Sequence, residues 1–122
     1  MSSMGFDWNR YLELARELEG RTEESALRSA ASRAYYSVFC QARNWLMARG
    51  WKRPPTDVHA SVWREFMSSG DSKRKQIGLD GKRLKRMRVM ADYDDTLHSP
   101  LSNAQDAVIK AAGVLAILSA LS

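Results

Sequence analysis

The sequence predicts an all-α protein, built as an antiparallel bundle of about five helices with a long second helix. Apolar residues recur at helical spacing along the chain, and no stretch alternates convincingly with a period of two. Most glycines and prolines fall between the periodic segments. At 122 residues the chain has the usual size of one domain, so we expect a single helical domain over residues 1–122.

The first two helices have clear boundary signals. The first is predicted to begin with Asp7 as its N-cap and to end at Gly20. The second is predicted to begin with Thr22 as its N-cap and to close at Arg49 and Gly50. That span corresponds to about 40 Å of helix at 1.5 Å per residue, so we expect it to be the spine of the domain.

A loop and a short third helix follow. Pro54 and Pro55 cannot continue a helix interior, so residues 51–55 are predicted to form the loop. Asp57 is predicted to cap the third helix, which Gly70 ends.

The start of the fourth helix is ambiguous, because Gly78 and Gly81 weaken its early part. It is predicted to begin near Asp71 or only after Asp80. Residues 94–100 then connect it to a fifth helix.

Ser102 and Gln105 have capping-box spacing for the start of this fifth helix. The helix has an alanine-rich face, which would allow a neighbouring helix to approach closely. Its most apolar stretch, residues 111–121, is too short to span a bilayer, which takes about 20 residues. We therefore expect no association with a membrane.

The positive charge is concentrated in one segment. The formal net charge is +5, and residues 73–88 contain eight Lys or Arg and one acid. Residues 89–122 contain four acids and one lysine. Such a basic segment permits an acidic partner such as nucleic acid, although a solvated face is the commoner role of a charge run.

The sequence favours a cytoplasmic protein without a metal or cofactor. Cys40 has no second cysteine to pair with, and it lies in an apolar stretch where a buried core residue is expected. No signal-peptide pattern and no glycine-rich phosphate loop is present. Asp92, Asp94 and Asp95 could hold a divalent cation, but solvated acids at a helix end are the preferred interpretation.

Two segments carry more specific motifs. The second helix contains Arg33-Ala34-Tyr35-Tyr36, an arginine followed closely by adjacent tyrosines. The fourth helix ends in Arg88-Val89-Met90-Ala91-Asp92-Tyr93, in which Arg88 and Asp92 lie one helical turn apart and can pair.

Together these motifs resemble the HEPN family (higher eukaryotes and prokaryotes nucleotide-binding domain) over about residues 7–121. His59 also falls where many members carry a histidine. The resemblance implies an antiparallel helical bundle, usually a homodimer. Members commonly occur beside a small nucleotidyltransferase in prokaryotic toxin–antitoxin or defence gene pairs, and many are metal-independent RNases.

The RNase members use an Arg-x4–6-His motif whose two copies meet across the dimer, and this sequence departs from it. Tyr93 stands at the first histidine position after Arg88, and His98 lies beyond the spacing. Tyrosine, with a pKa of about 10, is a poor general base at neutral pH but can donate a hydrogen bond to phosphate. In a catalytic site Arg88 would stabilise the phosphorane and Tyr93 or His98 would move protons, so Arg88 and Tyr93 are the candidate catalytic residues. The departure from the motif leaves binding intact.

The candidate binding residues come from the two motifs, the histidine position and the basic segment: Arg33, Tyr36, His59, Lys82, Arg83, Arg86 and Asp92. Because Arg33 lies in an apolar stretch, we predict that it pairs with Asp92 or a neighbouring acid. Alternatively, Tyr36 is a core residue, His59 a surface or capping residue, and the Arg88 pair a plain intrahelical ion pair.

The leading hypothesis is a HEPN-like dimeric module of a prokaryotic toxin–antitoxin or defence system. It would bind RNA, a nucleotide or a nucleotidyltransferase partner. One alternative is a metal-independent endoribonuclease whose atypical site lacks the usual histidine. Another is a purely structural interaction protein, which predicts that Arg88 and Asp92 are buried, fully paired and far from any cleft.

Overall fold

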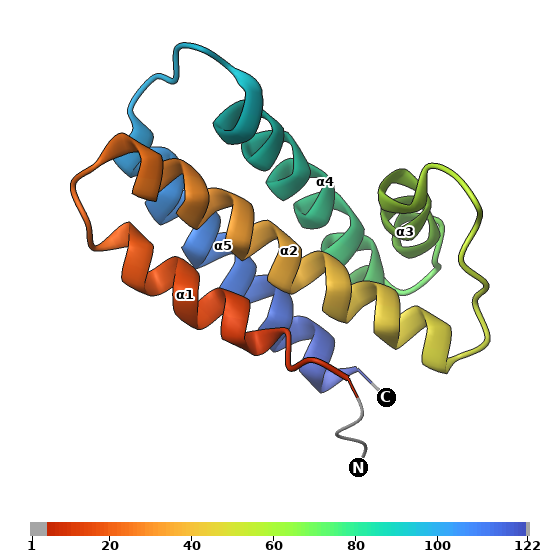
Figure 1. The fold of residues 1–122 in the computed structure, drawn as a ribbon. Helices are drawn as coiled ribbons and strands as arrows, with labels where there is room; N and C mark the ends of the chain where they lie inside the picture. The colour runs from red at the N-terminus through yellow and green to blue at the C-terminus, as the bar shows by residue number, and fades with distance from the viewer. Residues whose placement is uncertain (1–4, 122) are drawn as a thin grey trace.

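The computed structural model describes residues 5–121, and its helices follow the predicted order (Figure 1). No strand is present among these residues, so the prediction of an all-α bundle is confirmed. The longest helix is the second, with 25 residues. The predicted domain bounds stay a prediction, since residues 1–4 and 122 lie outside the described part. The helices are α1 Asn9–Glu19, α2 Glu24–Ala48, α3 Val58–Met67, α4 Ser72–Tyr93 and α5 Pro100–Ala120.

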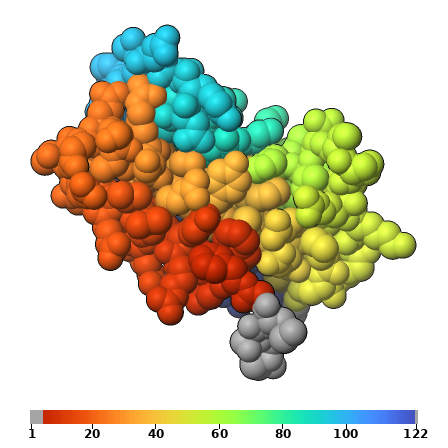
Figure 2. Space-filling view, viewed as in Figure 1, coloured from red at the N-terminus to blue at the C-terminus, as the bar shows by residue number. Residues whose placement is uncertain are grey.

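The middle of the bundle is formed by α2 and α5. Helix α2 contacts all four other helices, while α1 and α4 each contact both α2 and α5 but not each other. In Figure 1, α2 runs antiparallel to α1 and α4 and in the same direction as α5. Figure 2 shows α2 surface, in orange to yellow, between the surfaces of α1 and α4, so this side of α2 is only partly covered.

Small side chains allow the central helices to approach closely. The buried faces of α2 and α5 carry alanines with no exposed surface, as predicted for the fifth helix: Ala30, Ala34 and Ala42 on α2, and Ala104, Ala107 and Ala111 on α5. The lone thiol of Cys40 is buried as expected. Trp51 packs against this core from the loop after α2.

Helix α5 is longer than its apolar stretch suggested, because it begins at Pro100. The predicted capping box was wrong, since Ser102 lies inside the helix. Proline is well suited to the first helical position, where its missing N–H leaves no bond unmade. By length and composition alone α5 could cross a membrane, a criterion that core helices also meet; here its buried face packs against α2 and α4.

The N-caps differ from the prediction: the N-cap of α1 is Trp8 rather than Asp7, and Asp71, which was predicted only as a possible helix start, caps α4. The Asp7 carboxylate accepts a hydrogen bond from the Asn9 backbone N–H at 3.1 Å, and Asp71 accepts one from Arg74 at 2.9 Å. Thr22 does not cap α2, which begins after Glu23 without a side-chain cap. Asp57 precedes α3 in a left-handed conformation, with φ of 53°, and provides no side-chain cap either.

The earlier of the two predicted starts of α4 is the right one, and both of its glycines lie inside the helix. A Cβ atom at Gly81 would lie 2.3 Å from the Trp63 ring, and one at Gly78 would lie 2.5 Å from the Met67 side chain. These glycines therefore allow α3 to pack directly on α4, and this contact outweighs their low helix propensity.

Candidate functional site

Arg88 lies on the buried face of α4, with 9% of its surface exposed. Its Nη1 donates a hydrogen bond to Asp92 at 3.2 Å, so the predicted pair is confirmed. Its guanidinium carbon lies 5.5 and 5.3 Å from the ring centroids of Tyr35 and Tyr36, and its Nε is buried without a partner. Burial lowers the pKa of Arg88, but Asp92 and the two tyrosines outweigh that effect and raise it, so the side chain remains charged.

The end of α4 is fixed by two residues of α2. Ser32 donates a hydrogen bond to Asp92 at 3.3 Å, and this contact orients the carboxylate that holds Arg88. Arg28 donates to the backbone oxygens of Ala91 at 3.0 Å and Asp94 at 2.6 Å. These carbonyls have no partner within the helix, so Arg28 acts as a C-terminal cap from a neighbouring element.

Arg33 does not pair with Asp92, and that prediction was wrong. Its guanidinium carbon lies 4.7 Å from the centroid of the Tyr11 ring and 5.5 Å from that of Tyr36. Aromatic faces stabilise a cation without requiring an acid. Tyr36 therefore lies between two arginines, Arg33 on α2 and Arg88 on α4.

His59, in the first turn of α3, is held by side chains of α2. Its ring stacks on Phe39, with centroids 3.9 Å apart and planes within 8° of parallel. Its Nδ1 lies 2.7 Å from the Tyr35 hydroxyl. Burial, together with the charges of Arg88 and Lys85, lowers the pKa of His59 to about 4. The ring is therefore neutral at pH 7, and His59 is neither a free surface residue nor a helix cap.

A cavity of about 390 Å³ brings Arg88 and His59 together between α2, the start of α3 and α4. One carboxylate, that of Asp57, faces it. Four cationic side chains line it: Arg43 from α2, Arg53 from the loop between α2 and α3, and Lys85 and Arg88 from α4. The cavity is therefore a concentrated positive site.

The N-terminus of α3 adds backbone donors to this cavity. Val58, His59 and Ala60 line it, and Ser61 is the first residue whose N–H bonds back, to the Asp57 oxygen at 3.0 Å. The three preceding N–H groups have no intrahelical acceptor, and Asp57 gives no side-chain cap. An uncapped helix N-terminus of this kind favours an anion.

Tyr93 lies away from this cavity. Its side chain is 71% exposed, and it lines a different depression together with Glu24, Arg28 and acids at the end of α4. His98 is also exposed. The structure therefore does not bring either proton-transfer candidate of the sequence into the cavity that Arg88 lines.

The basic residues predicted on α4 divide between two faces. Lys82, Arg83 and Arg86 are exposed on the outer face, and Arg83 lies 3.6 Å from the Asp80 carboxylate. Lys85 turns inward to the cavity. The outer residues can extend a positive surface but do not line the site around Arg88.

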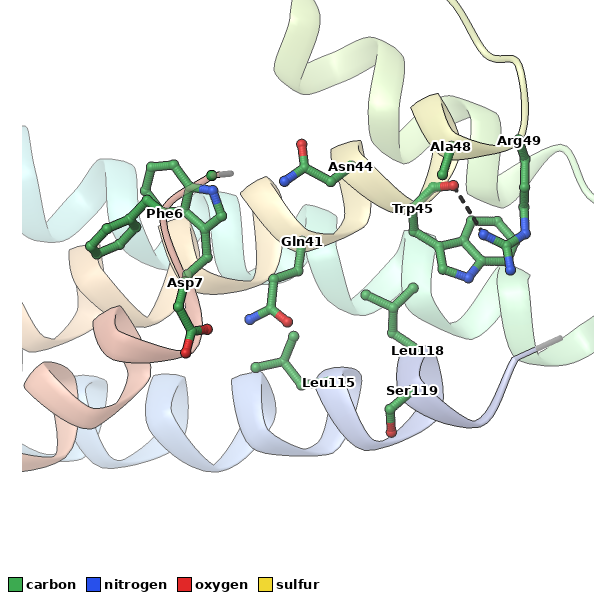
Figure 3. A pocket seen from close by; sticks show the side chains of 12 residues that line it. Phe6, Asp7, Gln41, Asn44, Trp45, Ala48, Arg49, Leu115, Leu118 and Ser119 are labelled. Atoms are coloured by element: carbon green, nitrogen blue, oxygen red, sulfur yellow. Dashed lines mark hydrogen bonds between the residues drawn. The ribbon is translucent and has the colours of Figure 1, made fainter. Parts of the chain in front are cut away.

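A larger cavity, of about 700 Å³, lies between the start of α1 and the C-terminal halves of α2 and α5 (Figure 3). Its walls combine aromatic and aliphatic side chains with the amides of Gln41 and Asn44. Its one arginine, Arg49, donates a hydrogen bond to the Trp45 backbone oxygen at 3.2 Å. The Arg49 guanidinium carbon also lies 3.7 Å from the centroid of the Trp45 ring. With one cationic side chain against the four around Arg88, this cavity is a weaker candidate for an anion.

Sequence reasoning missed Arg28, Arg43, Arg53 and Lys85. Arg43 lies ten residues after Arg33, and Arg53 lies in a loop with no helical spacing, so neither stood out. A signal was available for Lys85, since three positions separate it from Arg88 and place it on a neighbouring part of the same helix face.

Comparison with known proteins agrees with this architecture. A model of the HEPN domain matches residues 9–121. A UPF0332 protein of Thermotoga maritima is 32% identical over 90 residues, which cover 73% of this chain and 67% of that protein. No solved structure matches the chain.

Proposed function

Because the chain belongs to the HEPN domain family, we propose that it is a dimeric module that binds phosphate groups of RNA or a nucleotide at Arg88. We place it in the cytoplasm, in a prokaryotic toxin–antitoxin or defence system, with a nucleotidyltransferase as a protein partner. The observation that carries the binding proposal is the cavity in which four cationic side chains face one acid.

Arg88 is suited to hold an anion. Its guanidinium has five N–H donors in a planar fork, and one of them bonds to Asp92. Asp92 and the two tyrosine rings hold the group in place, so little side-chain entropy is lost when a phosphate binds. A purely structural arginine would be fully paired and far from a cleft, whereas this one lines a cavity.

The endoribonuclease alternative receives less support from the geometry. Tyr93 is exposed in a different depression, and the histidine near Arg88 is His59, whose Nδ1 is already engaged by Tyr35. A general base needs a free lone pair and a pKa near the working pH. His59 meets neither requirement.

Binding of a single-stranded RNA to the full chain at low salt, followed by fluorescence anisotropy, tests the proposal. We expect Arg88→Gln to weaken binding at least tenfold. Arg88→Lys, which keeps the charge but loses the fork, should give an intermediate loss. Arg16→Gln, an exposed arginine on α1, is the matched control and should change affinity less than twofold.

Unchanged affinity in a folded Arg88→Gln variant would overturn the proposal. The outer basic residues have a separate signature, because each phosphate contact contributes about 0.7 to the salt dependence of binding to a single strand. Lys82→Gln with Arg86→Gln should therefore flatten the plot of log affinity against log salt without removing binding. Sedimentation of the free chain, and of the chain mixed with a small nucleotidyltransferase, tests the proposed dimer and the proposed partner.

A further inference from the structure

We propose that the cavity lined by Arg88 and His59 is specific for a terminal phosphate, the phosphomonoester at the end of an RNA chain or nucleotide. This inference rests on the proposed function, since it concerns the same site. It adds a ligand class that distinguishes chain ends from the phosphodiester links along the chain.

Charge is the first argument. Arg43, Arg53, Lys85 and Arg88 line the cavity with Asp57, and Asp92 pairs with Arg88, which leaves an excess of two positive charges while His59 is neutral. An internal phosphodiester carries a single negative charge, whereas a terminal phosphate carries about −1.5 to −2 at pH 7. The cavity therefore gains more from a terminal phosphate than from an internal link.

The second argument is the arrangement of donors at the start of α3. The N–H groups of Val58, His59 and Ala60 are free of helical acceptors, and these residues line the cavity. Arg88 provides an independent observation, because it is nine-tenths buried, lines the same cavity and retains a buried Nε without a partner. Donors from α3 and α4 thus line one cavity, which suits the several free oxygens of a terminal phosphate.

The third argument is the tautomer of His59. The Tyr35 hydroxyl accepts a hydrogen bond from the Trp63 indole N–H at 3.1 Å and lies 2.7 Å from His59 Nδ1. The hydroxyl then donates its single O–H in a hydrogen bond to Nδ1, because otherwise this buried donor would have no acceptor. The histidine proton consequently resides on Nε2. His59 therefore offers the cavity a fixed neutral donor.

The volume of the cavity is suited to the terminal phosphate of an RNA chain or nucleotide. At about 390 Å³ it lies near the lower end of ligand pockets, which span roughly 300–1,000 Å³. This volume is sufficient for a phosphate with its adjoining sugar.

The test measures the affinity of the wild-type chain for one RNA sequence in three forms. These forms carry a 5′-phosphate, a 3′-phosphate or hydroxyl groups at both ends. We expect at least one phosphorylated form to bind ten times more tightly than the hydroxyl form. Inorganic phosphate at millimolar concentration should remove that difference. Equal affinity for all three RNAs would overturn the inference while leaving the proposed function intact, and no binding of any RNA would overturn the proposed function itself.

Variants of the cavity refine the test. His59→Gln and Lys85→Gln should each reduce the preference for the phosphorylated end at least threefold. Lys73→Gln, an exposed lysine on the same helix outside the cavity, should leave the preference unchanged. A preference that survives both cavity variants would place the end-binding site elsewhere and overturn this assignment. Phosphate should also shift the His59 Nε2–H resonance in NMR spectra of the wild-type chain.

Discussion

The Tyr35 hydroxyl lies 2.7 Å from Nδ1 of His59 and joins the spine helix α2 to the first turn of α3. Burial raises the pKa of Tyr35 well above its usual value, so this hydroxyl keeps its proton. The second of the two adjacent tyrosines, Tyr36, lies between Arg33 and Arg88. One tyrosine thus orients the histidine of the cavity, and the other contacts its arginine.

His59 should titrate near pH 4 in the folded protein. Burial disfavours the charged ring, and Arg88, Lys85 and Arg43 repel it, while Asp57 is the carboxylate facing the same cavity. NMR of a His98→Gln variant, which retains His59 as its single histidine, measures the midpoint. A midpoint near 6.5, the value of an unperturbed histidine, would contradict this account of the site.

The same shift makes the folded state less stable in acid. The pKa of His59 is lower in the folded chain than in the unfolded chain, so the unfolded state binds the proton more readily between pH 6.5 and 4. Above pH 6.5 the shift has no effect on the free energy of unfolding. As the pH falls from 6.5 to 4, the shift lowers the free energy of unfolding progressively. Urea denaturation should show that the stability of His59→Gln relative to wild type improves over that range. A difference independent of pH would argue against the shift.

Tyr35→Phe should destabilise the protein by about 1–3 kcal/mol, measured by urea denaturation. The change removes one oxygen atom but leaves both the Trp63 indole N–H and His59 Nδ1 without their partner. Tyr93→Phe is the matched control, because that side chain is 71% exposed, and its effect should stay within about 0.5 kcal/mol. Equal effects of the two substitutions would show that the hydrogen-bond chain contributes nothing to stability.

Glycine-to-alanine substitutions on two helices should have opposite signs. On α5, a Cβ atom at Gly113 would have no neighbouring atom within 4 Å. Gly113→Ala should therefore stabilise the protein by up to about 1 kcal/mol through helix propensity. Gly81→Ala places a methyl group 2.3 Å from the Trp63 ring and should destabilise by about 1–3 kcal/mol despite the same propensity gain. Thermal melts of both variants measure the contrast. A rise in melting temperature for Gly81→Ala would mean that α3 packs less closely on α4 than described.

Arg28→Ala should loosen the end of α4. The guanidinium bonds to the Ala91 and Asp94 carbonyls, and hydrogen bonds from a charged group contribute about 1.5–3 kcal/mol each at most. We expect a loss of stability of this order and faster amide exchange over residues 88–93. Arg10→Ala, an arginine whose side chain is 69% exposed on α1, serves as the control and should leave exchange there unchanged.

Local chemistry explains which helix boundaries could be predicted. Asp71 was one of two predicted starts of α4, and its carboxylate caps the helix by reaching the third N–H, a contact that depends only on neighbouring residues. Asp57 has the same side chain, yet it adopts a left-handed backbone and does not cap. The backbone conformation before the helix distinguishes Asp57 from Asp71, and the residue type alone does not specify it.

The candidate site divides in the same way. Arg88 and Asp92 were found because a helix places residues four apart side by side. Arg33 was predicted to require an acid, but Tyr11 of another helix stabilises it, and Ser32 contacts Asp92 instead. Which groups face each other across helices depends on packing, and single-sequence spacing carries no information about it.

By itself the sequence determined the helical class, the long spine, the family resemblance and the Arg88–Asp92 pair, because each depends on periodicity or on spacing within one helix. Only the tertiary structure decided that His59 and Arg88 share a cavity and that Tyr93 does not. These residues come from α3 and α4, and α2 packs against both helices. Glycines on α4 admit the Trp63 ring, and the resulting close contact of α3 with α4 places the histidine beside the arginine.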